Sequence, residues 1–218
     1  MDTRGWTPAM GLAVLVLFAL LIPAAAEAQT FGERTRVGAK AALNLNYVRD
    51  EILEENERSG FGTAAGVSIG GLLTFHTHPN VTIQTEFIYS VKNLELLDAG
   101  EDAVDDNIQV RYLEIPVVAK LHGEGGETAR PFVLVGGTIS FLTGAEQKST
   151  LGGVTVTEDI GDQLTSTEIG LTFGGGVDLL QDWGIITIDA RYNLALGDLP
   201  LEGNIKLDTF SIGGGVIF

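Results

Sequence analysis

The last eleven residues of the chain, DTFSIGGGVIF (208–218), carry the pattern that decides the fold class. Apolar side chains recur at every second or fourth position, at Phe210, Ile212, Val216 and Phe218. Chain ends usually fray into polar, poorly ordered segments, so an apolar ladder that reaches the last residue requires a fixed partner. A period of two places these four side chains on one face of a β-strand. We predict that the stretch is the closing strand of a barrel whose outer face contacts lipid.

The same period recurs in seven earlier stretches. In the first of them, Val37, Leu43 and Tyr47 share an apolar face, while Lys40 and Asn44 lie on the opposite face. The others lie at residues 65–75, 81–92, 107–122, 131–142, 168–179 and 186–194. Near Asp208 and Thr209 the alternation of the final stretch slips, which indicates a bulge or the rim of a membrane.

The connections between these stretches alternate between long and short. Long ones cover residues 49–61, 93–106 and 143–165, and short ones contain HTHPN (76–80), GEGGETA (123–129) and QDWG (181–184). In an up-and-down barrel with an even number of strands, long loops lie at one end and short turns at the other, together with both termini. The chain is therefore predicted to be all-β, an eight-stranded antiparallel up-and-down transmembrane β-barrel.

The N-terminus predicts the compartment. Arg4 precedes the apolar run GLAVLVLFALLI (11–22), and Ala26-Glu27-Ala28 forms a small-residue cleavage site. This is the pattern of a secretory signal peptide, and the run is too short for a helix that spans a bilayer. We expect residues 1–28 to be a cleaved signal peptide and residues 29–218 to form the barrel, located in the bacterial outer membrane with both termini in the periplasm.

Composition excludes several classes of protein. The formal net charge is −16, which argues against a nucleic-acid partner because such partners require basic patches. Cysteine is absent, which excludes disulfides, thiolate metal sites and an acylated lipoprotein cysteine.

The two faces of the strands differ in a way that favours a transmembrane barrel over a soluble one. The apolar face holds the bulky Phe, Tyr, Leu and Ile residues, whereas the polar face is rich in Gly, Ala, Ser and Thr, which suit a narrow interior. The charges on the polar face can neutralise one another, and a buried charge costs several kcal/mol unless it is paired. We therefore hypothesise an interior ion-pair network that plugs the lumen, the alternative being solvent-facing strand residues; the residues concerned are Lys40, Glu86, Lys92, Glu114, Lys120, Glu168, Asp178, Asp189 and Arg191.

Two stretches of the sequence resemble features of known outer-membrane proteins. The terminal ladder resembles the C-terminal signal by which the barrel-assembly machinery recognises outer-membrane barrels. The stretch VRYLEIPVVAKLH (110–122), followed by RPFVLVGG (130–137) and FGGGVDL (173–179), resembles the PorT-like outer-membrane β-barrel family. That resemblance implies an eight-stranded barrel; members of the family are mostly functionally unassigned, and one branch is linked to a secretion system. No catalytic motif of the family is matched.

Catalytic and metal sites are not expected. His76, His78 and His122 are predicted to lie in or beside the short turns, away from the outer leaflet where some small barrels modify lipid A. Carboxylates cluster in two long connections, but without the spacing of an EF-hand, so a solvated acidic face is favoured over a calcium site; they are Asp50, Glu51, Glu54, Glu55, Glu57, Glu95, Asp98, Glu101, Asp102, Asp105 and Asp106. No cofactor is predicted.

The leading functional hypothesis is a small outer-membrane barrel with a structural, envelope-integrity or interaction role. Its expected partners are outer-membrane lipid and lipopolysaccharide, whose phosphates the acidic loops could bridge through divalent ions, and the barrel-assembly machinery during biogenesis. The alternatives are a narrow pore or transporter for small solutes and a soluble lipocalin-like barrel that binds an apolar ligand; an enzyme ranks below all three.

Overall fold

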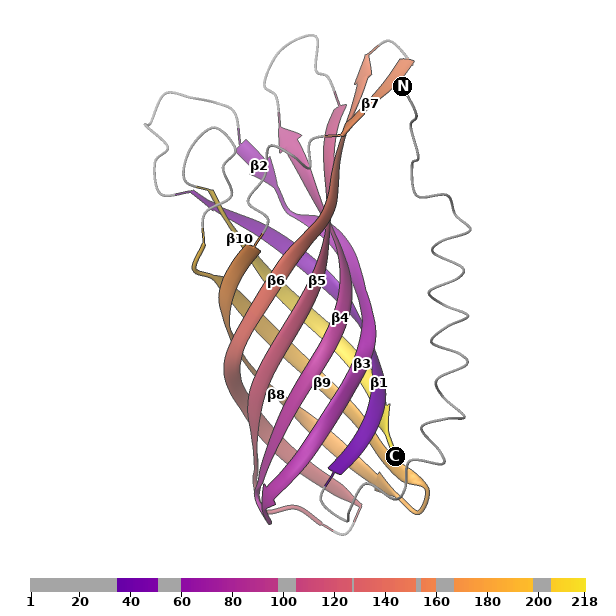
Figure 1. The fold of residues 1–218 in the computed structure, drawn as a ribbon, viewed down its shortest axis with the longest axis vertical. Coiled ribbons are helices and arrows are strands. Elements are labelled where there is room, and N and C mark those ends of the chain that lie inside the picture. Colours follow the sequence, from indigo (N-terminus) through magenta and orange to yellow (C-terminus); the bar gives the residue numbers. More distant parts are fainter. Residues whose placement is uncertain are drawn as a thin grey trace.

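The computed structural model describes residues 35–50, 60–97, 105–126, 128–151, 154–159, 167–197 and 205–218. No helix that is long and apolar enough to cross a membrane occurs in these ranges. The predicted signal peptide, residues 1–28, lies outside them. Eight long strands form an antiparallel cylinder (Figure 1), and they are β1 (Thr35–Asp50), β3 (Ala64–His78), β4 (Val81–Leu97), β5 (Asp105–His122), β6 (Ala129–Leu151), β8 (Thr167–Gln181), β9 (Gly184–Ala195) and β10 (Ile205–Ile217).

The cylinder is closed by the pairing of its first and last strands. β1 pairs with β10 from Gly38 opposite Ile217 to Asp50 opposite Ile205, and the other long strands each pair with their neighbours in the order β1, β3, β4, β5, β6, β8, β9, β10. The backbone N–H of Phe218 continues this pairing by donating to the carbonyl oxygen of Val37 at 2.8 Å. The predicted eight-stranded antiparallel barrel is thus confirmed.

Two short strands lie beyond the closed cylinder. β2 (Gly60–Gly62) pairs with the end of β4, and β7 (Val154–Asp159) forms a hairpin with the end of β6. Figure 1 shows both at the same end of the molecule, which we call the loop end; the opposite end, with the turns after β3 and β8, is the turn end.

The long connections predicted at residues 49–61, 93–106 and 143–165 are shorter than expected. β4 continues to Leu97, β5 begins at Asp105 and β6 continues to Leu151. The strand ends were predicted from the apolar face of each strand, which is needed only where the barrel contacts lipid. The backbone hydrogen bonds between strands continue beyond that region into water, so the strands are longer than the apolar pattern. His76 and His78 belong to the end of β3 rather than to the turn that follows it, and His122 is the last residue of β5, beside a short turn as predicted.

Of the two explanations offered for the slip near Asp208, a bulge or the rim of the membrane, the bulge is absent from the β1–β10 ladder, whose register runs unbroken through Asp208 and Thr209. Register shifts occur instead between His76 and His78 in the β3–β4 ladder, and between Arg111 and Tyr112 in the β5–β6 ladder. Asp208 is a polar residue on the outward face, and the apolar pattern slips there because of its side chain rather than its backbone.

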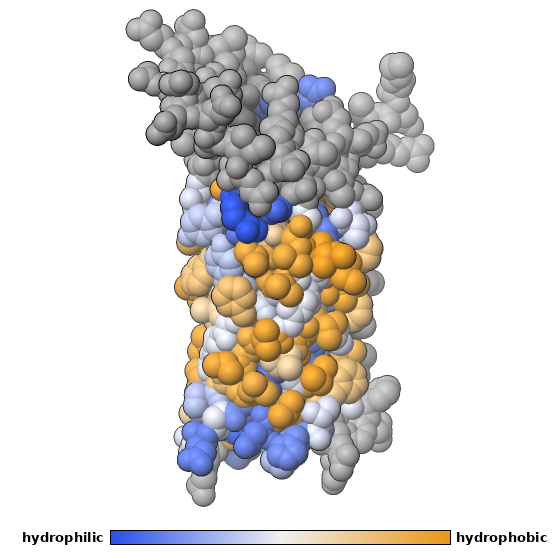
Figure 2. Space-filling model, turned by 90° about the vertical axis from the view of Figure 1, so that its left-hand side faces the viewer, coloured by the Kyte–Doolittle hydropathy of each residue, from blue (hydrophilic) through white to orange (hydrophobic). Residues whose placement is uncertain are grey.

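Bulky side chains point outward and charged ones inward. Phe87, Leu171 and Ile188 are 49%, 47% and 46% exposed, whereas Glu86 and Arg191 are only 1% and 6% exposed. Figure 2 shows the outward apolar residues as a band between hydrophilic residues at its two edges. On β10 this band runs from Phe210 to Phe218, which matches the roughly 9–11 residues that a tilted strand needs to cross a bilayer. A soluble barrel would bury these side chains in its interior.

Candidate functional site: the charged lumen

Alternation along the strands directs one set of charged residues into the lumen. In β1 the residues of even number, from Gly38 to Asn46, face inward, and their cross-strand partners in β10 and β3 share that face. Each of the nine residues predicted for the interior network lies in this inward register. Eight of them are buried, and Glu114 has a side chain that is 12% exposed.

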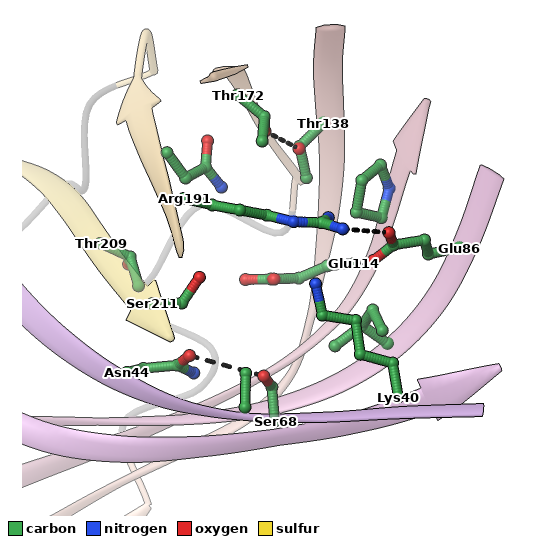
Figure 3. A pocket seen from close by; sticks show the side chains of 14 residues that line it. Lys40, Asn44, Ser68, Glu86, Glu114, Thr138, Thr172, Arg191, Thr209 and Ser211 are labelled. Carbon is green, nitrogen blue, oxygen red and sulfur yellow. Dashed lines mark hydrogen bonds and ion pairs between the residues drawn. The ribbon is translucent and has the colours of Figure 1, made fainter. Parts of the chain in front are cut away.

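Four residues from three strands form a central cluster, which consists of Lys40, Glu86, Asp189 and Arg191. The Arg191 Nη2 lies 2.8 Å from Glu86 Oε1, and its Nε lies 2.9 Å from Asp189 Oδ1 (Figure 3 shows the Arg191–Glu86 pair). Lys40 Nζ lies 2.6 Å from both carboxylate oxygens of Asp189. Gln84 donates a further hydrogen bond to Glu86. Each charge in the cluster therefore has a partner of opposite sign.

Glycines make the Lys40–Asp189 pair possible. β10 lies between β1 and β9, and its inward positions opposite Lys40 and Ala42 are Gly215 and Gly213. A Cβ atom at Gly213 would lie 3.1 Å from Lys40 Cε. Because these positions lack side chains, the lysine can extend over β10 to reach Asp189 on β9.

A lower cluster, nearer the turn end, consists of Lys120, His122 and Asp178. Lys120 Nζ lies 2.9 Å and 3.0 Å from the two oxygens of Asp178, and His122 Nε2 lies 3.0 Å from Asp178 Oδ2. Lys120 also lies over the ring of Phe132, with Nζ 3.8 Å from the ring centre. A cation over an aromatic face gains electrostatic stabilisation when it is removed from water.

An upper cluster, nearer the loop end, consists of Lys92, Tyr112, Glu114 and Glu168. Lys92 Nζ lies 2.7 Å from Glu114 Oε1 and 5.0 Å from the centre of the Tyr112 ring. The Tyr112 hydroxyl donates a hydrogen bond to Glu168. Glu168 is thus satisfied by a neutral donor rather than by a cation at short distance.

Apolar side chains fill the lumen at both ends of these clusters. At the loop end Leu94, Ile108, Val110, Ala145 and Leu207 pack around Tyr112. Toward the turn end there are two groups, which consist of Leu72, Ile185 and Ile217 and of Val118, Phe132 and Leu134.

A small polar cavity of about 50 Å³ remains beside the central cluster. Thr138, Thr172, Asn44 and Ser68 line it together with charged side chains (Figure 3), and the two threonine hydroxyls are 2.6 Å apart. Its volume suits a few water molecules.

The structure brings together all nine residues that the sequence placed inside, in three separate clusters rather than one network. Sequence reasoning did not identify Tyr112, Gln84 or His122 as partners in the lumen. Parity places Gln84 and His122 on the polar face beside Glu86 and Lys120, but neither was included in the predicted network. Among the residues described, no three His, Cys, Asp or Glu side chains are grouped so as to hold a metal ion.

Three residues of the predicted assembly signal, Phe210, Ile212 and Val216, share the outward face of β10, and the fourth, Phe218, directly follows that strand. The Phe218 ring lies 6.0 Å from the ring of Trp183, which is in the turn between β8 and β9. Paired aromatic rings of this kind suit the interface between a membrane and water.

Comparison with known proteins gives a family and a set of similar folds. The sequence profile of the family described as "Outer membrane protein beta-barrel domain" matches residues 27–200. No curated protein gave a match. Among solved structures, the outer membrane protein OprG from Pseudomonas aeruginosa is 12% identical with a TM-score of 0.53, and the match covers 85% of this chain and 96% of that chain.

Two other solved barrels are similar over comparable lengths. Neisserial surface protein A (NspA) is 18% identical with a TM-score of 0.45, covering 84% of this chain and 97% of that chain. The attachment invasion locus protein Ail of Yersinia pestis is 13% identical with a TM-score of 0.40, covering 85% of this chain and 99% of that chain.

Proposed function

The chain belongs to the outer membrane protein beta-barrel domain family, and from this premise we propose that it is a closed, non-conducting barrel with a structural or interaction role. Location in the bacterial outer membrane follows from the family. We further propose that ion pairs plug the lumen, that both termini lie in the periplasm, and that the loop end is the surface that binds any partner. The proposal assigns no catalytic reaction to the barrel. Membership of the PorT-like branch also stays a hypothesis, based on residues 110–122.

The pairing of the lumen charges carries the proposal. Opening a water path through the centre would separate Arg191 from Glu86 and Lys40 from Asp189 in a region with little water. Removing one partner of a buried ion pair costs about 3–5 kcal/mol, so these pairs resist rearrangement. The apolar groups at both ends add a second barrier, because a narrow hydrophobic constriction excludes water.

The proposed topology follows from the same geometry. With the loop end at the cell exterior, the turn end and Phe218 face the periplasm, where the barrel-assembly machinery would bind the outward ladder of β10. Residues 1–28 would direct export and be removed before assembly. The exterior surface would then contact lipopolysaccharide.

Single-channel recording of the purified, refolded full chain in planar lipid bilayers tests the plug. We expect the wild type to show no conductance steps, and a variant in which alanine replaces Lys40, Glu86, Asp189 and Arg191 to conduct. A matched control replaces the outward neighbours Phe87 and Ile188 by alanine and should stay closed. Regular steps from the folded wild type would favour the narrow pore instead, and a closed cluster variant would show that the ion pairs are not the plug.

A further inference from the structure

The outward face of the neighbouring strands β4, β5 and β6 changes from apolar to polar near the loop end (Figure 1 shows the three strands). The last row of apolar and aromatic residues across them consists of Tyr89, Leu113 and Phe141. Leu113 and Phe141 are 39% and 40% exposed. The next outward residue of β5 toward the loop end is Arg111, and the one after it is Gln109. Such a change of polarity is expected where a strand leaves the hydrocarbon of a bilayer.

On the loop-end side of this row, four outward side chains form one connected group, which we call the polar platform. It consists of Asn93, Gln109, Arg111 and Glu146. Gln109 Nε2 donates to Asn93 Oδ1 at 3.1 Å, and Arg111 Nη2 donates to Gln109 Oε1 at 3.1 Å. Arg111 Nη2 also lies 2.8 Å from Glu146 Oε1. The side chains of Arg111 and Glu146 are 21% and 32% exposed, so the platform is accessible from outside the barrel.

A β-bulge in β6 places Glu146 on this face. The β5–β6 register shifts between Arg111 and Tyr112, so Thr143 on β6 has no partner in that ladder. The Thr143 hydroxyl donates to the carbonyl oxygen of Arg111 at 3.0 Å, which holds the bulge in place. One extra residue moves every later side chain of the strand to the opposite face. Ala145 is consequently buried and Glu146 lies outside, whereas an unbroken strand would exchange their positions.

The polar platform presents planar polar groups whose charges cancel. Its two amides lie beside one guanidinium and one carboxylate, and Glu146 balances Arg111. Gly144, the cross-strand neighbour of Arg111, leaves the guanidinium uncovered, and a Cβ atom there would lie 3.6 Å from Arg111 Nη1. A guanidinium has five N–H donors, more than these contacts use. Each hydroxyl of a sugar both donates and accepts, so adjacent hydroxyls match this surface, whereas the Glu146 carboxylate would repel a phosphate.

We propose that the polar platform binds the neutral sugar residues of a glycolipid in the outer leaflet. The platform faces sideways, directly beyond the apolar side chains that contact acyl chains, so the ligand that meets it is held in the same membrane. A glycolipid matches both surfaces, because its acyl chains can lie along Leu113 and Phe141 while its sugars reach Gln109 and Arg111. The inference rests on the proposed orientation, in which the loop end faces the cell exterior.

The test compares diglucosyl diacylglycerol with phosphatidylcholine of the same acyl chains. Binding of each lipid to the full chain is measured by native mass spectrometry in micelles of a detergent without a sugar headgroup. We expect the wild type to bind the glycolipid about tenfold more tightly, the effect of one or two net hydrogen bonds. Gln109→Met and Arg111→Met should each lower this ratio about threefold or more. Gln109→Met leaves the Arg111–Glu146 pair in place, so it separates lost binding from local unfolding.

Arg49→Met is the matched control. Arg49 is also an outward arginine near the loop end, and its Nε lies 3.2 Å from Asp208 Oδ2, but it belongs to β1 and not to the platform. Its replacement should leave the ratio unchanged. A ratio near one for the wild type would overturn the proposal, and so would a ratio that Gln109→Met leaves unchanged or that Arg49→Met lowers as much as Arg111→Met does.

Phosphatidylglycerol with the same acyl chains is the third lipid. The wild type should bind it less tightly than the glycolipid, and Glu146→Gln, which leaves one net positive charge on the platform, should bind it more tightly than the wild type does. Equal binding of phosphatidylglycerol and glycolipid by the wild type, with the same dependence on Arg111, would show an anion site and overturn the proposal. Conductance is recorded on the same preparations: a conducting wild type that still prefers the glycolipid through Gln109 would contradict the plug but not the platform.

Discussion

Asp208, within β10, shows how a polar side chain can complete the hydrogen bonds at the end of a neighbouring strand, here β9 at Ala195. The β9–β10 ladder ends at Asn193 opposite Thr209, so the backbone N–H and carbonyl groups of Ala195 find no partner in that ladder. The Asp208 carboxylate accepts from the N–H, and Arg49 donates to the carbonyl. Side chains thus replace the ladder beyond the last outward apolar residue of β10, Phe210, and the aspartate is tolerated on an outward face.

The first prediction concerns this carboxylate. Asp208→Asn should lower the free energy of unfolding by about 1–3 kcal/mol, because hydrogen bonds to a charged group are lost and Arg49 loses its partner. Urea unfolding in lipid vesicles, followed by the mobility of unheated samples in detergent gels, gives the change. Asp182→Asn, in the exposed turn between β8 and β9, is the control and should have no effect. Equal stability of the two variants would contradict the role assigned to Asp208.

The second prediction concerns the central cluster. Asp189→Ala leaves Lys40 without its closest partner and deprives Arg191 of one of two, and should cost about 3–5 kcal/mol. Replacing the pair as Lys40→Met with Asp189→Leu should recover most of that loss, because a buried ion pair and an apolar pair of similar volume are nearly equivalent. The same urea assay measures both. If the double variant is no more stable than Asp189→Ala, the cost arises from packing rather than from an unpaired lysine.

At the scale of the strands, the sequence predicts the segments that cross the bilayer, but not the parts of the strands that extend beyond it. Lipid on one side and a narrow lumen on the other force a strict alternation, so residues 37–47 could be identified as a strand from parity alone. Beyond the membrane both faces of β6 meet water, so residues such as Gln147 and Lys148 show no alternation and the strand could not be recognised. The β6–β7 hairpin was missed although Gly152-Gly153, followed by the alternation of valine and threonine from Val154 to Thr157, is a hairpin signal in the sequence.

Individual ion pairs could not be predicted either. Parity places Lys40 and Asp189 inside the barrel, but whether they meet depends on the stagger between strands and on the absence of side chains on β10. Parity placed these charged residues on the inward face of the strands, where they are buried, but it does not indicate which of them pair. Tyr112 illustrates the limit, since an inward tyrosine looks like packing until Glu168 is found beside its hydroxyl.

The third prediction tests the glycines of β10. A Cβ atom at the inward Gly213 would lie 2.7 Å from Ala41 O and 3.1 Å from Lys40 Cε, whereas one at the outward Gly214 would have 3.5 Å to Thr187 O as its closest contact. Gly213→Ala should therefore destabilise the barrel by about 1–3 kcal/mol, the usual cost of overpacking. Gly214→Ala should change stability by less than about 0.5 kcal/mol. Equal effects in the urea assay would show that backbone strain, and not the path of Lys40, governs both positions.

At the scale of the whole molecule, the barrel reverses the distribution of polarity that a soluble protein has. Its interior holds Lys40, Lys120 and Arg191 with their carboxylates, while leucine and phenylalanine cover the outside. Burying the charges is tolerable because each has a partner, and exposing the apolar residues is favourable only in hydrocarbon. Both features follow from one orientation of the strands, in which the apolar face meets hydrocarbon and the charged face lines the lumen.

Spin-label accessibility tests that claim most directly, and the absence of native cysteine allows a single label at any chosen site. Nitroxides placed one at a time at Phe87, Leu171 and Ile188 of the barrel in lipid vesicles should collide often with oxygen, which concentrates in hydrocarbon, and rarely with a water-soluble nickel chelate. A label at Thr172, the inward neighbour of Leu171, should be shielded from the oxygen dissolved in lipid. Frequent collisions with nickel at Phe87, Leu171 and Ile188 would contradict the account.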